Sequence, residues 1–81
     1  MSLDSAVLQA IGELGTEAYG VPLRRRASEL TEKWWRLWGV SYGALYCALD
    51  RLEKGGRISS YSVYGGPERG FRDKRIYLRM D

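Results

Sequence analysis

The stretch VSYGALYCALDRLEKGGRISSY, residues Val40 to Tyr61, predicts a helix that ends abruptly and is followed by a strand. Ser41 is a suitable N-cap, because its hydroxyl can accept a hydrogen bond from an amide of the first helical turn. The apolar stripe of the helix consists of Leu45, Ala48, Leu49 and Leu52. The opposite face is polar and mostly small, and consists of Gly43, Tyr46, Cys47, Asp50 and Lys54.

Gly55 and Gly56 end this helix, since glycine adopts the left-handed conformation of a C-cap without steric penalty. Ile58 to Tyr64 then supplies the β-branched and aromatic residues of a strand. A short helix with a leucine stripe, a sharp stop and a strand are typical of the recognition helix and first wing strand of a winged helix-turn-helix.

Three segments of the chain resemble PadR-like transcriptional regulators. SYGALYCALDRLEKGGRI resembles the family pattern Ser-Pro-Gly-(Thr/Ala)-Leu-Tyr followed by a leucine-spaced helix, with Tyr42 in place of the usual proline. AYGVPLRRR, from Ala18 to Arg26, resembles the start of the family's second helix. PERGFRDKRIYL, from Pro67 to Leu78, resembles its basic wing. The resemblance covers most of the chain in the family's order and implies a DNA-binding transcriptional regulator, expected to act as a repressor.

Two further helices are predicted before the recognition helix. The first has the apolar stripe Leu3, Val7, Leu8, Ile11 and Leu14, with Asp4 or Ser5 near its start and Gly15 beyond its end. The second begins near Val21, where Pro22 suits the first turn. Its apolar residues recur at spacings of four and three up to Trp38, which predicts one helix that is either long or broken near Thr31. Its second half contains WWRLW, an insertion relative to shorter PadR-like proteins.

The C-terminal part of the chain predicts a β-hairpin. Ile58 to Tyr64 and Phe71 to Leu78 flank a loop rich in glycine. In the second strand, Ile76, Leu78 and Met80 alternate with Tyr77 and Arg79, which predicts one buried and one wetter face. The predicted fold class is α+β, mainly α: a single winged helix-turn-helix domain over residues 1–81, with three helices and a two-stranded wing.

The amino-acid composition limits the classes of function to be expected. The 81 residues are 44% hydrophobic and 28% charged, as in a small globular domain. The chain has no histidine, the commonest general base and metal ligand, and its one cysteine has no evident base. We therefore expect no enzyme, no metal and no cofactor, and the sequence identifies no small-molecule effector. No apolar run is long enough to span a membrane and no signal-peptide pattern is present, so we expect a cytoplasmic protein.

The net charge of +3 is compatible with double-stranded DNA as the partner. The recognition helix, about residues 41–54, is expected in the major groove, and the basic wing, residues 65–75, on the backbone or minor groove. The candidate DNA-binding residues are Ser41, Tyr42, Gly43, Tyr46, Arg69, Arg72, Lys74 and Arg75. Asp50 would repel phosphates, unless it pairs with Lys54 or accepts from a cytosine amino group. The run Arg24 to Arg26 fans across a helical turn, so at most one or two of these arginines are expected to contact phosphates.

The chain has more large apolar residues than so small a core needs. We therefore predict a homodimer whose interface consists of Leu3, Val7, Trp34, Trp35 and Trp38. The 81 residues contain no match to the C-terminal dimerisation segment of PadR-like proteins, so the interface is expected at these positions instead. The alternative interpretation is a winged helix that binds another protein through the WWRLW surface.

Overall fold

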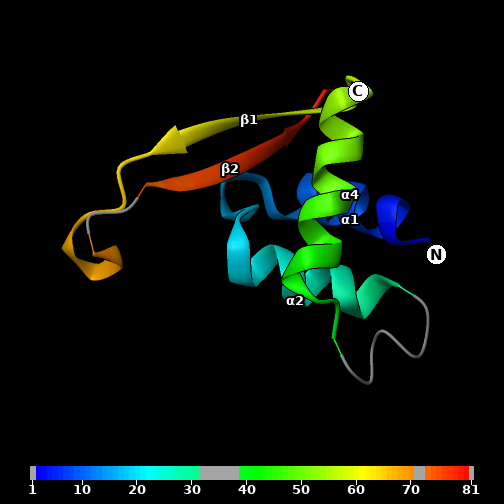
Figure 1. Ribbon diagram of the computed structural model, residues 1–81, viewed down its shortest axis with the longest axis horizontal. Coiled ribbons are helices and arrows are strands. Elements are labelled where there is room, and N and C mark those ends of the chain that lie inside the picture. The colour runs from blue at the N-terminus through cyan, green and yellow to red at the C-terminus, as the bar shows by residue number, and fades with distance from the viewer. Residues whose placement is uncertain (1, 32–38, 71–72, 81) are drawn as a thin grey trace.

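The computed structural model describes residues 2–31, 39–70 and 73–80 of the chain. The α-helices in these ranges are α1 (Leu3–Leu14), α2 (Gly20–Leu30) and α4 (Tyr42–Lys54). The helices are followed by an antiparallel hairpin of β1 (Ile58–Val63) and β2 (Lys74–Arg79), which extends away from them (Figure 1). This mainly helical α+β arrangement is the layout of a winged helix, so the predicted fold class is confirmed.

Helix α1 supplies one wall of the core. Its N-cap is Ser2, whose Oγ accepts a hydrogen bond from the Ser5 amide at 3.2 Å, so the helix starts slightly earlier than Asp4 or Ser5. Its buried residues are Ala6, Val7, Leu8, Ala10 and Ile11. The helix ends at Leu14 with Gly15 just beyond it as the C-cap, as predicted, and a 3₁₀ turn at Gly15–Glu17 leads towards α2.

Helix α2 ends at Leu30, so the prediction of one continuous helix towards Trp38 is wrong. Thr31 has an extended backbone, with φ −85° and ψ −166°, which places the break where the alternative prediction put it. The Thr31 hydroxyl donates a hydrogen bond to the Ser28 carbonyl at 3.1 Å. The hydroxyl thereby occupies a backbone carbonyl in the last turn of the helix, and such side-chain bonds of threonine compete with the helical backbone bonds. Residues 32–38, which hold WWRLW, lie outside the described ranges.

Helix α4 has the predicted cap at each end. The Ser41 Oγ accepts from the Ala44 amide at 3.1 Å. At the other end the amides of Gly56 and Arg57 donate to the carbonyls of Glu53 and Leu52, each at 3.0 Å. This is a Schellman motif, in which Gly56 takes the left-handed position with φ 75°. The glycine stop is confirmed.

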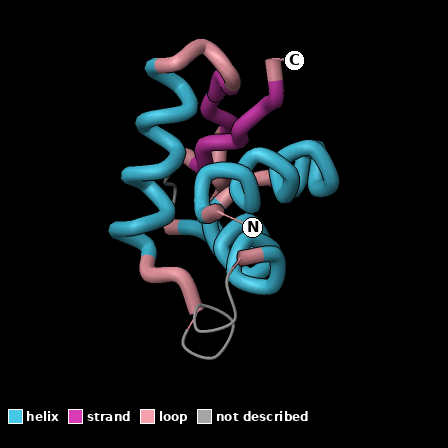
Figure 2. Tube along the Cα trace, turned by 90° about the vertical axis from the view of Figure 1, so that its right-hand side faces the viewer, coloured by secondary structure: helices cyan, strands magenta, loops and turns pink. Residues whose placement is uncertain are grey.

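The core lies between the three helices and the base of the hairpin. Figure 2 shows the other helices packed against one side of α4, while its opposite side stays open. The buried cluster contains Val7, Leu8, Ala10, Ile11, Ala18, Leu23, Ala27, Val40, Leu45, Ala48, Leu49, Leu52, Ile58 and Tyr77. The predicted leucine stripe of α4 is thus confirmed as its core side.

The hairpin pairs Ile58 with Arg79 at its base and Val63 with Lys74 at its far end. The Tyr77 amide donates to the Ala18 carbonyl at 3.0 Å, which fixes β2 against the segment before α2. The predicted alternation of burial in β2 is wrong: Ile76 and Tyr77 are both buried, whereas Leu78 and Met80 are 42% and 61% exposed. Tyr77 joins the core cluster, whereas Leu78 and Met80, which follow the buried Ile76 on the same face of the strand, are exposed towards its C-terminal end.

Candidate nucleic-acid interface

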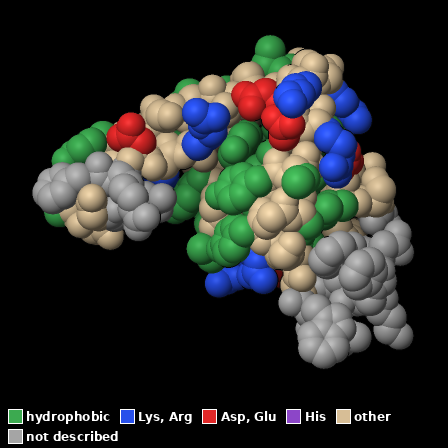
Figure 3. Space-filling model, viewed as in Figure 1, with side chains coloured by type: hydrophobic (Ala, Val, Ile, Leu, Met, Phe, Trp, Pro, Cys, Tyr) green, Lys and Arg blue, Asp and Glu red, His purple; other side chains and the backbone are tan. Residues whose placement is uncertain are grey.

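The N-terminal half of α4 carries on its open side the exposed residues Tyr42, Gly43, Tyr46 and Cys47, which we call the α4 face. Residues four apart lie above one another on a helix, so the four form a single surface. The side chains of Tyr42 and Tyr46 are 42% and 48% exposed, and their rings are stacked with centroids 6.2 Å apart. Figure 3 shows apolar side chains gathered over α4 on this side, with acidic and basic ones mixed towards its C-terminal end.

Helix α2 holds the start of α4 through the buried residue Val40. The Ser28 hydroxyl accepts from the Val40 amide and donates to the Arg24 carbonyl, both at 2.8 Å. The Arg24 Nε donates to the Val40 carbonyl at 2.5 Å. Both polar groups of the Val40 backbone are therefore satisfied by α2, which fixes where α4 begins.

The side chains of the arginine run in α2 point in different directions, as expected for consecutive residues of a helix. The Arg24 guanidinium lies over the Tyr42 ring, 5.1 Å from its centroid, in a cation–π contact. Arg26 points to α1, where its Nε lies 2.6 Å from a Glu13 carboxylate oxygen. Arg25 is exposed. Arg24 thus brings a positive charge to the edge of the α4 face.

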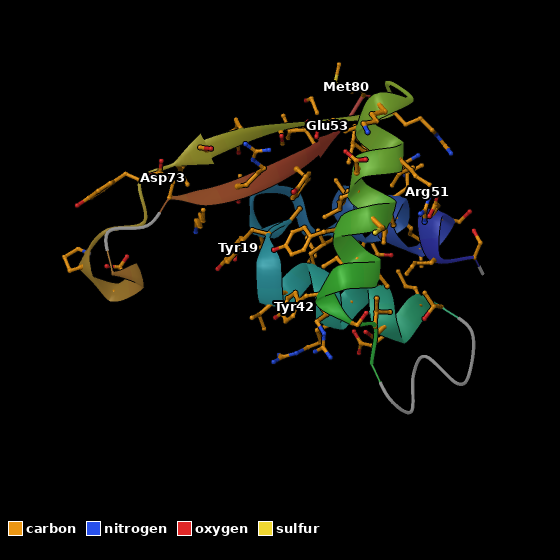
Figure 4. All side chains as sticks on the ribbon, in the orientation of Figure 1. Tyr19, Tyr42, Arg51, Glu53, Asp73 and Met80 are labelled. Atoms are coloured by element: carbon orange, nitrogen blue, oxygen red, sulfur yellow. The ribbon has the colours of Figure 1, made fainter. Side chains whose placement is uncertain are left out.

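A hollow of about 210 Å³ lies between α4, the start of α2 and the wing strand β2. Its lining residues are Tyr19, Gly20, Tyr46, Asp73, Lys74, Arg75 and Tyr77. The Lys74 ammonium lies 4.1 Å from the centroid of the Tyr19 ring. Figure 4 shows Tyr19 between α4 and the hairpin, with Asp73 farther out along the hairpin. Three of the predicted site residues, Tyr46, Lys74 and Arg75, therefore come together around one hollow.

The charged side chains in the C-terminal half of α4 are largely paired with protein groups. Lys54 Nζ lies 3.0 Å from Asp50 Oδ2, which is the predicted i,i+4 pair. Arg51 donates two hydrogen bonds to the Asp4 carboxylate of α1, at 2.7 and 3.2 Å. These bonds hold the pKa of Asp4 below its usual value, against an opposing effect of partial burial. Arg51 therefore ties α4 to α1.

Tyr77 is a buried residue among those that line the hollow. Burial raises the pKa of its hydroxyl, and the neighbouring Tyr46 and Glu53 raise it further, while Arg75 opposes them. Glu53 also accepts a hydrogen bond from the Ser60 hydroxyl of β1 at 2.9 Å. The Glu53–Ser60 bond joins α4 to β1, and Tyr77 brings β2 into the core cluster that it shares with the leucines of α4.

The other predicted DNA-binding residues do not line the hollow, and the structure describes some of them only in part. Ser41 is exposed at the start of α4, where its oxygen already caps the helix. The backbone of Arg69 lies in a 3₁₀ turn, Pro67–Arg69, at the tip of the wing. The Arg69 side chain and all of Arg72 lie outside what the structure describes. Of the four wing cations, Lys74 and Arg75 are the ones whose side chains can be assigned to the interface.

The predicted dimer surface requires one correction. Val7 is 0% exposed and belongs to the core of the chain, so it has no surface to offer a partner. The apolar stripe of α1 contains both core-facing and flanking positions, which periodicity alone does not separate. Leu3 is half-buried against the core. Trp34, Trp35 and Trp38 lie outside the described residues.

Sequence reasoning missed Ser28 and Val40 as positioning residues and Tyr19 as part of the hollow. Ser28 stands beside the apolar residue Ala27, and the one available signal is a small polar residue next to a core position. Tyr19 precedes the glycine at which α2 begins. Neither signal identifies a contact across elements, because the partners are distant in the chain.

Fold and surface together define a winged-helix domain with an exposed aromatic helix beside a basic strand. Comparisons with protein-family models, with curated proteins and with solved structures found no match. Within the described ranges, no helix has both the length and the apolar character needed to cross a bilayer.

Proposed function

We propose that the chain is a DNA-binding transcriptional regulator of the PadR-like type, acting as a repressor. In this proposal α4 enters the major groove and the wing, residues 65–75, contacts the backbone or minor groove. The observation that carries it is the hollow shared by Tyr46 of α4 and by Lys74 and Arg75 of β2. A helix and a basic strand that border one concave surface can contact a groove and its flanking phosphates together.

The surroundings of α4 support this orientation. The start of a helix carries partial positive charge, and here Arg24 adds a full charge beside Tyr42. The Ser41 hydroxyl hydrogen remains available to a phosphate oxygen, because the cap uses the hydroxyl as an acceptor. Asp50, the acid on the outer side of α4, is partly neutralised by Lys54. The N-terminal half of α4 is therefore the part suited to approach DNA.

We further propose that the regulator works as a cytoplasmic homodimer without catalytic activity. A single α4 face offers few charged contacts, and two-fold pairing doubles them on a palindromic site. With Val7 in the core, the proposed interface reduces to Leu3 and the tryptophans of residues 34–38. Sedimentation at micromolar concentration, repeated with Trp35→Glu, tests it. Met80→Glu places the same charge at an exposed apolar position of the hairpin and serves as the control.

The experiment that tests DNA binding is a fluorescence-polarisation titration against the DNA upstream of the chain's own gene, at several salt concentrations. Binding should weaken steeply as salt rises, because the cations release counterions from the phosphates. The alternative, a protein-interaction module that uses the WWRLW surface, predicts a complex with another protein that responds little to salt. Absence of binding to any duplex at low salt would contradict the proposed function.

A further inference from the structure

We propose that the α4 face selects thymine, by packing aromatic and apolar atoms against the C5-methyl group that thymine presents in the major groove. The inference rests on the proposed function and names the feature of DNA that this face recognises. Its four residues, Tyr42, Gly43, Tyr46 and Cys47, offer ring carbons, two phenol hydroxyls, a thiol and an open backbone. The methyl group of thymine is the apolar group among the base edges of that groove.

The hydrogen-bonding code of the major groove points in the same direction. Guanine is read by Arg or Lys, adenine by Asn or Gln, and cytosine by Asp or Glu. The α4 face contains none of these residue types. Arg24, at its edge, already donates a hydrogen bond to the Val40 carbonyl, and Asp50 lies one turn beyond Tyr46 on the same side of the helix. The charged groups nearest in sequence are already paired: Arg51 contacts Asp4 at 2.7 Å, and Asp50 contacts Lys54 at 3.0 Å. Apolar contact is therefore the readout that this surface is best equipped to make.

The two tyrosines are held in place before any DNA arrives. The Tyr42 ring contacts both the Arg24 guanidinium, 5.1 Å from its centroid, and the stacked ring of Tyr46, whose centroid is 6.2 Å away. Side chains that are already ordered lose less conformational entropy on binding. At Gly43, an added Cβ would meet no other heavy atom within 4 Å, so the helix surface beside the rings is open to an approaching base.

The proposal can be tested with four short duplexes that change the methyl group and the minor groove separately. Alternating A·T carries the methyl group, and alternating A·U lacks it. Alternating I·C shows the same minor-groove pattern as A·T but has no methyl group, and I·C with 5-methylcytosine restores one at the same ring position. Dissociation constants are measured by polarisation at a fixed, low salt concentration.

We expect A·T to bind more tightly than A·U, and the 5-methylcytosine duplex more tightly than unmodified I·C. The burial of one methyl group corresponds to about a fourfold change in affinity. Equal affinity within both pairs would overturn the inference and leave the proposed function standing, because DNA would still be bound. No binding to any of the four duplexes would remove both.

Three variants assign the effect to the α4 face. Tyr46→Ala should abolish the difference within each pair, whereas Tyr46→Phe, which keeps the ring and removes the hydroxyl, should retain it. Arg75→Ala should weaken all four duplexes by a similar factor and leave the ratios unchanged. A methyl effect that survives Tyr46→Ala unchanged would contradict the assignment.

Discussion

The Ser28 hydroxyl of α2 accepts a hydrogen bond from the Val40 amide at 2.8 Å, just before α4 begins. Ser28 is 9% exposed and Val40 is 0% exposed, so water cannot easily replace either partner. The same hydroxyl donates to the Arg24 carbonyl within α2. A single small side chain of α2 therefore fixes the residue that precedes Ser41, the N-cap of α4, and so helps to decide where the α4 face lies.

Ser28→Ala should therefore destabilise the chain by about 1–3 kcal/mol, because it leaves a buried amide without a partner. The free energy of unfolding, from urea titration, measures this. Ser62→Ala, which removes an exposed hydroxyl from β1, is the matched control and should change stability little. If Ser28→Ala and Ser62→Ala behave alike, the hydroxyl does not anchor α4.

Two substitutions in α4 should separate packing from binding. Leu49→Ala removes a side chain that is 2% exposed and should cost about 2–5 kcal/mol of stability through reduced burial and a cavity. Tyr46→Ala, at a position 48% exposed, should reduce DNA affinity and leave the melting temperature nearly unchanged. Thermal unfolding together with polarisation measures both. Unfolding of the Tyr46→Ala protein would mean that its ring is structural.

Gly43→Ala should raise stability and lower DNA affinity together. Alanine is favoured over glycine inside a helix by up to about 1 kcal/mol, and the added methyl group meets no other heavy atom within 4 Å. The same methyl group would project from the α4 face between helix and base. Melting temperature and duplex affinity should therefore move in opposite directions, and an unchanged affinity would show that the backbone at Gly43 does not approach DNA closely.

Replacing both Lys74 and Arg75 with alanine should weaken binding to every duplex about equally. The slope of log affinity against log salt should flatten by about one for each phosphate that is no longer neutralised. Arg57→Ala removes an exposed cation near the end of α4 and should leave the slope as it is. A double variant with the slope of the unmodified chain would contradict the role of the wing.

The Asp4–Arg51 pair should make part of the stability depend on pH. Because the folded-state pKa of Asp4 is lowered, its contribution is complete above the unfolded-state pKa and is lost as the pH falls through the folded value. Asp4→Asn should slightly lower the melting temperature at neutral pH. The difference from the unmodified chain should shrink below about pH 4. A difference that stays constant under acid conditions would exclude the ion pair as its cause.

How far the sequence predicts the candidate site depends on the range of the interactions. Spacing alone places Ser41, Tyr42, Gly43 and Tyr46 on the open side of α4, because helical periodicity relates residues within a few turns. The alternation predicted for β2 is wrong at Leu78 and Met80, since burial in a strand depends on which layer covers each face. Val7 belongs to the predicted partner surface by its apolar character, yet it faces the core.

The sequence by itself determined the order of helices and strands, the caps of α4 at Ser41 and Gly56, and the leucine stripe that docks this helix. These features follow from interactions between residues close together in the chain. Only the tertiary structure decided that Ser28 and Arg24 hold Val40, that Arg51 reaches Asp4, and that Tyr46 shares a hollow with Lys74 and Arg75. Those partners are far apart in sequence, and packing of the common core brings them together.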